Sequence, residues 1–200
     1  MATAPRSVDP RVKRTRQLLQ QAFLELLQEK SFTGISIQDI TERATVNRGT
    51  FYAHFADKHA LMDSIVREQF QQVISSKLPP TAQWNKRSLC LLIQSVEGYL
   101  QDMDSHCRPP GGMDPLFERA VQEEICHVLV SWLKRVPTTE ARWPVPIESV
   151  ALVVSWAIFG AAVEWSQGAK MLSAERMAND VLLVLTEGLA RLTPDTLLEQ

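Results

Sequence analysis

Apolar residues recur at helical spacing along most of this 200-residue chain, and this periodicity constrains the fold more than any other feature. A first helix is predicted over residues 10–30, where Leu19, Phe23 and Leu26 lie on one wide apolar stripe. Further helical patterns cover 37–44, 47–55, 57–78, 86–104, 115–136, 147–168 and 173–192. Since no segment shows the alternation of a strand, we expect an all-α fold of about nine helices.

Polar residues and prolines mark the predicted helix ends. Ser36 and Asp39 have the spacing of a capping box, in which an N-cap hydroxyl and an acid three residues later satisfy each other's backbone N–H groups. Asn47 is the expected N-cap of the third helix, and Asp57 is that of the fourth. The fourth helix should end before the Pro79-Pro80 pair, because proline cannot continue a helix.

The short helices of residues 37–44 and 47–55, joined by a tight turn and supported by the long first helix, fit a helix-turn-helix. In that motif the second helix enters the major groove of DNA. Residues 47–50 are small or hydrogen-bonding, whereas Phe51 and Phe55 can pack into the core. We therefore expect base readout and burial on opposite faces of this helix.

The stretch from Arg14 to Met62 resembles the DNA-binding module of the TetR family of transcriptional repressors. Its most specific part is the spacing of Ile37, Ile40 and Ala44, followed by the run Val46-Asn47-Arg48-Gly49-Thr50-Phe51-Tyr52 with His54, Phe55 and Lys58. The resemblance implies contacts to bases or adjacent phosphates by Thr45, Arg48, Gly49 and Thr50, and contacts to the phosphate backbone by Tyr52, His54 and Lys58. We add Ser36, Asn47 and Arg14 to this predicted DNA-binding set.

Elementary chemistry supports several of these roles. Arg48 can donate two hydrogen bonds to guanine O6 and N7, and the Tyr52 hydroxyl can donate to a phosphate. Lys58 falls in the first turn of the fourth helix, where backbone N–H groups also face an anion. Outside this motif, a Tyr beside two Phe residues is often core and a single surface Arg is usually only solvated.

Charge divides the chain in two. Residues 1–60 hold nine basic and six acidic residues, a net charge of +3, whereas the remainder has a net charge of −5. This is typical of a nucleic-acid reader attached to a second domain. Arg6, Arg11, Lys13 and Arg14 define a basic arm over residues 1–14, which either reaches DNA or is a solvated tail. We predict a DNA-binding domain (1–60) and a helical domain for effector binding and dimerisation (61–200).

The helix of residues 147–168 is apolar nearly all round, so it requires burial on more than one side. In TetR-family proteins the last two long helices pair with their symmetry mates as a four-helix bundle, and the resemblance implies a homodimer of this kind. The alternative is that both helices complete a monomer core. The predicted dimer-interface residues are Val153, Trp156, Gly160, Ala161, Val181 and Leu185.

The resemblance also implies a small-molecule effector that binds in the second domain, shifts the fourth helix and moves the recognition helices apart, so that DNA is released. An apolar pocket would suit a hydrophobic or aromatic effector. The residues that could line it, although each could equally be plain core, are Met103, Met113, Phe117, Trp132, Trp156, Phe159 and Trp165.

Other functions find little support. The chain has no phosphate loop, nucleophile elbow or HExxH motif, so we expect neither an enzyme nor a cofactor. Three cysteines without CxxC spacing suggest no metal site. The apolar run Val150–Val163 is short for a membrane span and the N-terminus lacks a signal peptide, so we expect a cytoplasmic, nucleoid-associated protein. The predicted function is a repressor of pseudo-palindromic operators; an activator, or a regulator whose second domain binds a protein, is the alternative.

Overall fold

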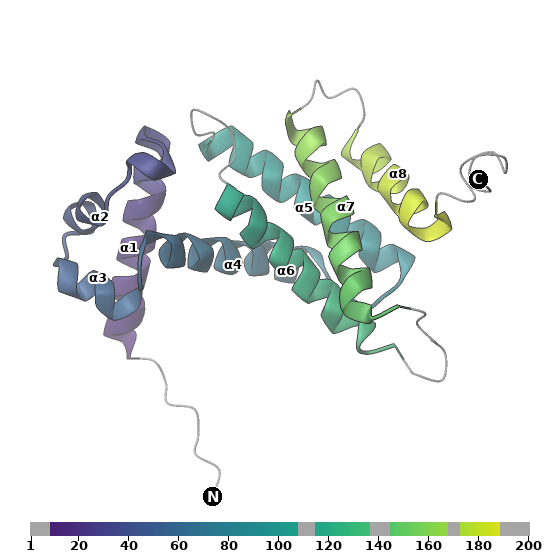
Figure 1. Cartoon of the computed structure of the whole chain (residues 1–200), viewed down its shortest axis with the longest axis horizontal. Helices are drawn as coiled ribbons and strands as arrows, with labels where there is room; N and C mark the ends of the chain where they lie inside the picture. Colours follow the sequence, from purple (N-terminus) through teal and green to yellow (C-terminus); the bar gives the residue numbers. More distant parts are fainter. Residues whose placement is uncertain (1–8, 108–114, 137–144, 168–172, 189–200) are drawn as a thin grey trace, which may run out of the picture. The chain divides into compact units, whose positions relative to one another are not determined.

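The computed structural model describes residues 9–107, 115–136, 145–167 and 173–188 (Figure 1). Within these ranges the chain forms eight α-helices, one 3₁₀ turn and no strand. The predicted all-α class is confirmed. The described residues form eight α-helices where the sequence predicted about nine, and each of these eight corresponds to one predicted helical pattern. The elements are α1 (Pro10–Glu29), η1 (Phe32–Gly34), α2 (Ile37–Ala44), α3 (Arg48–His54), α4 (Lys58–Lys77), α5 (Lys86–Cys107), α6 (Pro115–Leu133), α7 (Ile147–Gln167) and α8 (Ala174–Glu187).

The predicted helix caps are confirmed by their hydrogen bonds. The Ser36 hydroxyl accepts from the Asp39 N–H at 3.1 Å, and the Asp39 carboxylate accepts from the Ser36 N–H at 2.7 Å. Asn47 Oδ1 accepts from the Thr50 N–H at 2.7 Å, and Asp57 Oδ1 accepts from the Ala60 N–H at 2.8 Å. Helix α4 ends at Lys77, ahead of the proline pair. Local side-chain chemistry therefore fixes where α2, α3 and α4 begin.

The chain divides into two compact units. The N-terminal unit comprises the described residues of Met1–Ile65 and Cys107–Phe117, and the C-terminal unit comprises those of Val66–His106 and Glu118–Gln200. The division therefore falls inside α4 rather than at residue 60, where we had placed it from the sequence. Three helices have residues in both units: α4 is divided after Ile65, the last residue of α5 (Cys107) falls in the N-terminal unit, and so do the first three residues of α6 (115–117).

In the N-terminal unit, α2 packs against α1 and α3 packs against α2 (Figure 1). The centre of this core is formed by Leu19 and Phe23 of α1, Ile40 of α2 and Phe51 of α3, whose side chains are fully buried. Burial of each such side chain contributes about 1.5 to 3 kcal/mol. The Phe51 anchor fixes the rotation of the seven-residue helix α3 about its own axis, and so decides which of its residues face outward.

In the C-terminal unit, α7 and α8 lie side by side (Figure 1). The Phe70 ring of α4 meets the Tyr99 ring of α5 edge to face at 5.6 Å. A buried hydrogen bond of 2.7 Å runs from the Gln122 side chain of α6 to the Ser155 hydroxyl of α7. Apolar packing and this polar contact together tie α4 to α5 and α6 to α7.

Helix α7 is the one described helix that is long and apolar enough to cross a membrane by length and composition alone. Core helices pass the same test, so this finding leaves the expectation from the apolar run Val150–Val163 in place. Its composition has another explanation in the fold, because Ala151, Ile158 and Ala162 are buried within the unit while Leu152 and Val153 are exposed. The helix is thus apolar both on its core face and on an outer face.

Candidate nucleic-acid interface

Helix α3 has one buried and one exposed face, as predicted. Phe51 is fully buried and Phe55, at the C-cap, is 5% exposed. On the other side Arg48, Gly49 and Tyr52 are exposed, and the Tyr52 ring keeps 48% of its surface accessible. A large aromatic side chain left in solvent beside two buried ones is a feature of binding surfaces. The helix therefore presents a polar strip that its own core packing does not need.

The first turn of α3 is shaped by its cap. Asn47 Oδ1 accepts from both the N–H and the hydroxyl of Thr50, at 2.7 and 3.0 Å. A Cβ atom at position 49 would lie 3.3 Å from that same oxygen, so any larger residue there would press on the cap. Gly49 consequently keeps the cap intact and leaves the N-terminus of the helix open to close approach by a ligand.

Arg48 and Tyr52, one turn apart on α3, form a pair. Arg48 Nη2 donates to the Tyr52 hydroxyl at 3.2 Å, and the guanidinium carbon lies 5.7 Å from the centre of the Tyr52 ring. A guanidinium has five N–H donors, so this contact orients Arg48 while leaving donors for a base edge or a phosphate. Both side chains are therefore free to make the contacts predicted from the sequence, Arg48 with base edges and Tyr52 with the phosphate backbone of DNA.

The turn between α2 and α3 contains a strained residue. Thr45 has φ 56° and ψ 45°, and it is the one non-glycine residue with positive φ in the described part of the chain. A β-branched residue is rare in this left-handed conformation, which costs about 1 to 2 kcal/mol. The strain lies beside the predicted reading face, and Thr45 itself is exposed there.

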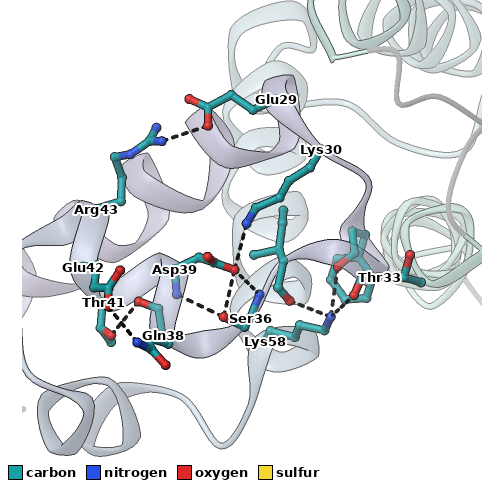
Figure 2. Close-up of polar contacts among 12 residues, drawn as sticks. Glu29, Lys30, Thr33, Ser36, Gln38, Asp39, Thr41, Glu42, Arg43 and Lys58 are labelled. Atoms are coloured by element: carbon teal, nitrogen blue, oxygen red, sulfur yellow. Dashed lines mark hydrogen bonds and ion pairs between the residues drawn. The ribbon is translucent and has the colours of Figure 1, made fainter.

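Lys58 has a role that the sequence did not reveal (Figure 2). Its ammonium donates to the carbonyl oxygens of Phe32 at 2.9 Å, Ile35 at 2.8 Å and Thr33 at 3.4 Å. The same nitrogen lies 4.6 Å from the centre of the Phe32 ring. These contacts fasten the first turn of α4 to the 3₁₀ turn η1. The geometry thus supports a structural role for Lys58 as the alternative to the phosphate contact that the family resemblance implies.

Ser36 is likewise occupied within the protein (Figure 2). Its hydroxyl donates to Asp39 Oδ2 at 2.8 Å, and the Lys30 ammonium lies 2.8 Å from the same oxygen. The Lys30 ammonium and the hydrogen bonds from Ser36 hold the pKa of Asp39 well below its usual range. A phosphate contact by Ser36 would therefore use a hydroxyl that already serves the capping box.

A surface hollow of about 460 Å³ lies beside this network, lined by Leu26, Glu29, Lys30, Asp39, Glu42 and Arg43. Arg43 is ion-paired with Glu29 at 2.9 Å (Figure 2). It is also ion-paired with Glu25 at 3.5 Å. The Arg43 guanidinium, by hydrogen bond and charge, lowers the pKa of Glu29. Because its cations and carboxylates pair with one another, this hollow is a poor match for the apolar effector expected from the sequence.

The predicted basic arm is in part helical. Asp9 accepts from the Arg11 N–H at 2.9 Å and caps α1, which begins at Pro10, so Arg11, Lys13 and Arg14 are exposed residues of a helix. Arg6 lies outside the described residues. A further cation, which the sequence reasoning missed, is Arg16: its guanidinium lies 4.7 Å from the centre of the Phe55 ring and donates to the Ser64 hydroxyl at 2.7 Å. His54 is partly exposed at the end of α3.

The seven residues predicted to line an effector pocket do not share one environment. Trp132, Phe159 and Trp165 are buried in the C-terminal unit, and Met103 is partly exposed there. Phe117 is buried but groups with the N-terminal unit, and Met113 lies outside the described residues. Trp156 is 48% exposed, which places it on the surface of α7.

The predicted dimer-interface residues lie mainly on exposed or partly exposed surface. Val153 is 67% exposed, Gly160 is exposed with open space around it, and Ala161, Val181 and Leu185 are partly exposed. Sequence reasoning missed further exposed apolar side chains on the same two helices, namely Leu152, Leu183 and Val184. The apolar surface of α7 and α8 is thus broader than the six predicted residues.

Comparison with known proteins agrees with this geometry. Residues 19–65, which include α2, α3 and the start of α4, match the family model for bacterial regulatory proteins of the tetR family. Residues 19–65 therefore form a DNA-binding module of the tetR-family type. The TetR helix-turn-helix is therefore the module built by α2 and α3, and the resemblance seen from Arg14 to Met62 is confirmed.

Among curated relatives, the chain is 41% identical over 70 residues to an uncharacterized HTH-type transcriptional regulator, YxbF, of Bacillus subtilis, covering 34% of this chain and 18% of that protein. It is 31% identical over 90 residues to the HTH-type transcriptional repressor DhaR of a Mycobacterium species, covering 42% of this chain and 46% of DhaR. It is 31% identical over 61 residues to the dhaKLM operon transcriptional activator DhaS of Lactococcus lactis, covering 30% and 33%. The chain thus spans less than half the length of each of these relatives.

Solved structures share the fold over most of the chain. A TetR transcriptional regulator from Streptococcus agalactiae superposes with a TM-score of 0.62 at 20% identity, covering 88% of this chain and 96% of that one. The regulator FadR from Bacillus subtilis, solved in complex with stearoyl-CoA, gives 0.54 at 17% identity, covering 86% and 98%. At these identities the likeness establishes the helical fold alone.

Proposed function

We propose that this chain is a transcriptional regulator that binds a pseudo-palindromic operator as a homodimer and is released by a small-molecule effector. The observation that carries the proposal is the outward face of α3, where the Arg48–Tyr52 pair stands exposed opposite the buried Phe51. An arginine near the N-terminus of a helix, oriented by a neighbouring tyrosine, suits recognition of a base edge in the major groove.

The dimer rests on the apolar surface of α7 and α8. Leu152, Val153 and Trp156 of α7 and Leu183 and Val184 of α8 each keep between 44% and 67% of their surface accessible. Soluble proteins rarely leave such a patch uncovered unless it is an interface. A second copy of the chain is the occupant that also explains DNA recognition, because two recognition helices about 34 to 36 Å apart would meet successive major grooves.

Helix α4 supplies the proposed route from effector to DNA. Its first turns are fastened to the N-terminal unit by Lys58, which donates to η1, and by Ser64, whose hydroxyl accepts from Arg16. Its second half is fastened within the C-terminal unit by Arg67, which is ion-paired with Glu123 at 3.1 Å and with Glu124. A ligand that shifts the second half of α4 would therefore displace residues that brace α3.

Repression is the proposed outcome of binding. The relatives include the repressor DhaR and the activator DhaS, so helix-turn-helix modules of this kind serve both outcomes. Occupancy of an operator that overlaps a promoter represses, and we take this as the default. We further propose that the protein acts in the cytoplasm, where its DNA lies, and that regulation rather than catalysis is its role.

The test is selection of bound sequences from a random duplex pool by the purified full-length chain, with light scattering of the same sample to give its mass. We expect an enriched inverted repeat and a species of twice the chain mass. Failure to enrich any sequence at low salt, with protein shown to be folded, would refute operator binding. Enrichment of a single half-site by a species of one chain mass would refute the dimer.

A further inference from the structure

Glu97, on α5 in the C-terminal unit, is a buried acid without a partner. The residue is 1% exposed, and neither carboxylate oxygen has a hydrogen-bond partner among the described residues. Ile93 and Leu100, which share its face of α5 at helical spacing, are buried and apolar. Burial raises the pKa of Glu97 to about 7, so the group is charged in an appreciable fraction of molecules near neutral pH.

Such an arrangement is costly. An unpaired carboxylate in an apolar core costs several kcal/mol, and even the protonated acid leaves a hydroxyl donor and an acceptor unsatisfied. Other polar groups of this unit are paired: Gln122 donates to Ser155 at 2.7 Å, and Arg67 is ion-paired with Glu123. Glu97 thus lacks the hydrogen-bond partner that these other polar groups have. A buried polar group without a partner indicates a ligand-binding role.

The charges around Glu97 indicate what kind of group would satisfy it. The pKa of Cys90 on α5 is raised first by its own burial and then by the charges of Glu97 and of Glu175 at the start of α8, so two acids lie within electrostatic reach of this thiol. An anionic ligand would be repelled and a purely apolar one would leave both oxygens unsatisfied. A protonated amine has three N–H donors and a positive charge, and satisfies both oxygens.

The position of Glu97 also connects it to α4. Tyr99, two residues further along α5, donates from its hydroxyl to Gln69 Oε1 at 3.4 Å, and its ring packs against Phe70. Gln69 and Phe70 belong to the half of α4 that lies in the C-terminal unit. A group inserted beside Glu97 would thus press on the segment of α5 that holds α4.

We propose that Glu97 is the anchor for the cationic amine of an effector whose apolar body packs among the buried side chains of α5 and its neighbours. The inference rests on the proposed effector-binding role of the C-terminal unit and names the chemical class of that effector. It narrows the hydrophobic or aromatic ligand expected from the sequence to an amphiphilic amine.

The test uses 4-phenylbutylamine and its neutral counterpart 4-phenylbutanol as probes, titrated calorimetrically into the full-length chain at about pH 8, where Glu97 is ionised. A charge-assisted hydrogen bond favours the amine by roughly tenfold to a hundredfold in Kd. Glu97→Gln should reduce that preference to about twofold or less. Glu175→Gln, which removes an exposed acid from the same region, should leave it unchanged.

Equal affinity of the wild-type chain for both probes, or no binding of either at millimolar concentration, would overturn the proposal. So would a preference that persists in Glu97→Gln. Thermal melts supply a second measurement: a Glu97→Gln chain less stable than wild type at pH 8 would mean that the carboxylate has a stabilising partner. Because no DNA is present, these results are independent of operator selection, whose failure would count against the regulator alone.

Discussion

At the scale of single residues, the sequence leaves two roles open for Lys58, binding a DNA phosphate or holding η1 in place. Its contacts distinguish between them. A lysine in the first turn of a helix can neutralise a phosphate, and the family resemblance implies that it does. The structure instead shows its ammonium shared between the carbonyls of Phe32 and Ile35. Three carbonyls around one ammonium leave little capacity for a further ligand, since the group has only three donors.

We predict that Lys58→Ala lowers the free energy of unfolding by roughly 1 to 3 kcal/mol, because hydrogen bonds from a charged donor to η1 are lost. The salt dependence of operator binding, measured by fluorescence anisotropy at several ionic strengths, should stay the same. Lys77→Ala, an exposed lysine at the end of α4, is the control for loss of charge. A salt slope smaller by about one, with unchanged stability, would instead place Lys58 on a phosphate.

Substitutions of Arg48 and Tyr52 should have different effects on DNA binding. Arg48→Ala is expected to relax preference at one or two base pairs, costing roughly 1 to 3 kcal/mol, because a bidentate base contact disappears. Tyr52→Phe should weaken operator and non-operator duplexes alike, since its hydroxyl is expected on a phosphate. Arg43→Ala, whose guanidinium pairs with Glu29, is the matched control. Uniform weakening across all sequences by Arg48→Ala would reassign that residue to the backbone.

We predict that the buried Glu97 makes the free energy of unfolding depend on pH. Its pKa is raised to about 7 from the usual 4.5, so the folded state holds a proton that the unfolded chain releases, and stability falls as pH rises from about 4.5 through 7. The other titratable groups of this region are Cys90 and Glu175. Glu97→Gln should match wild type below pH 4.5 and exceed it by roughly 1 to 3 kcal/mol at pH 8 in denaturant titrations. An equal gain at both pH values would show that charge burial is not the cause.

At the scale of elements, the helices and their starts were predictable because caps and breakers act locally. Ser36, Asn47 and Asp57 each bind an N–H three residues away, so their roles are visible in sequence spacing. The 3₁₀ turn η1 and its contacts with Lys58, 23 to 26 residues away, were not predictable because they depend on how α4 returns to α1. The composition of α7 predicts that it has more apolar surface than one core face can bury. Which of its residues lie on the exposed outer face could be seen only in the folded structure.

The turn between α2 and α3 offers a test of strain. Thr45→Gly should raise the free energy of unfolding by about 0.5 to 1 kcal/mol, because relief of the left-handed conformation outweighs the added flexibility of the unfolded chain. The same exchange at Thr50, inside α3, should lower stability by about 1 kcal/mol. Thermal unfolding of both variants decides the matter. Destabilisation by Thr45→Gly would mean that the threonine side chain contributes more than its backbone costs.

At the scale of the whole molecule, function depends on two copies acting together. Val153→Asp places a charge on the most exposed of the large apolar side chains of α7 and should give a species of one chain mass in light scattering. Operator affinity should fall at least tenfold, because half of the phosphate and base contacts are lost. Leu116→Asp, at an exposed apolar position on α6, is the control. A dimer that persists in Val153→Asp would move the interface elsewhere.

The central claim is that two α3 helices read the major groove of one operator. Methylation of guanine N7, which lies in the major groove, followed by recovery of the duplexes that still bind, tests this directly on the selected sequence. We expect interference at two symmetric clusters of guanines on opposite sides of the dyad, and none in the outer flanks of the operator. A single cluster, or binding indifferent to major-groove methylation, would contradict it.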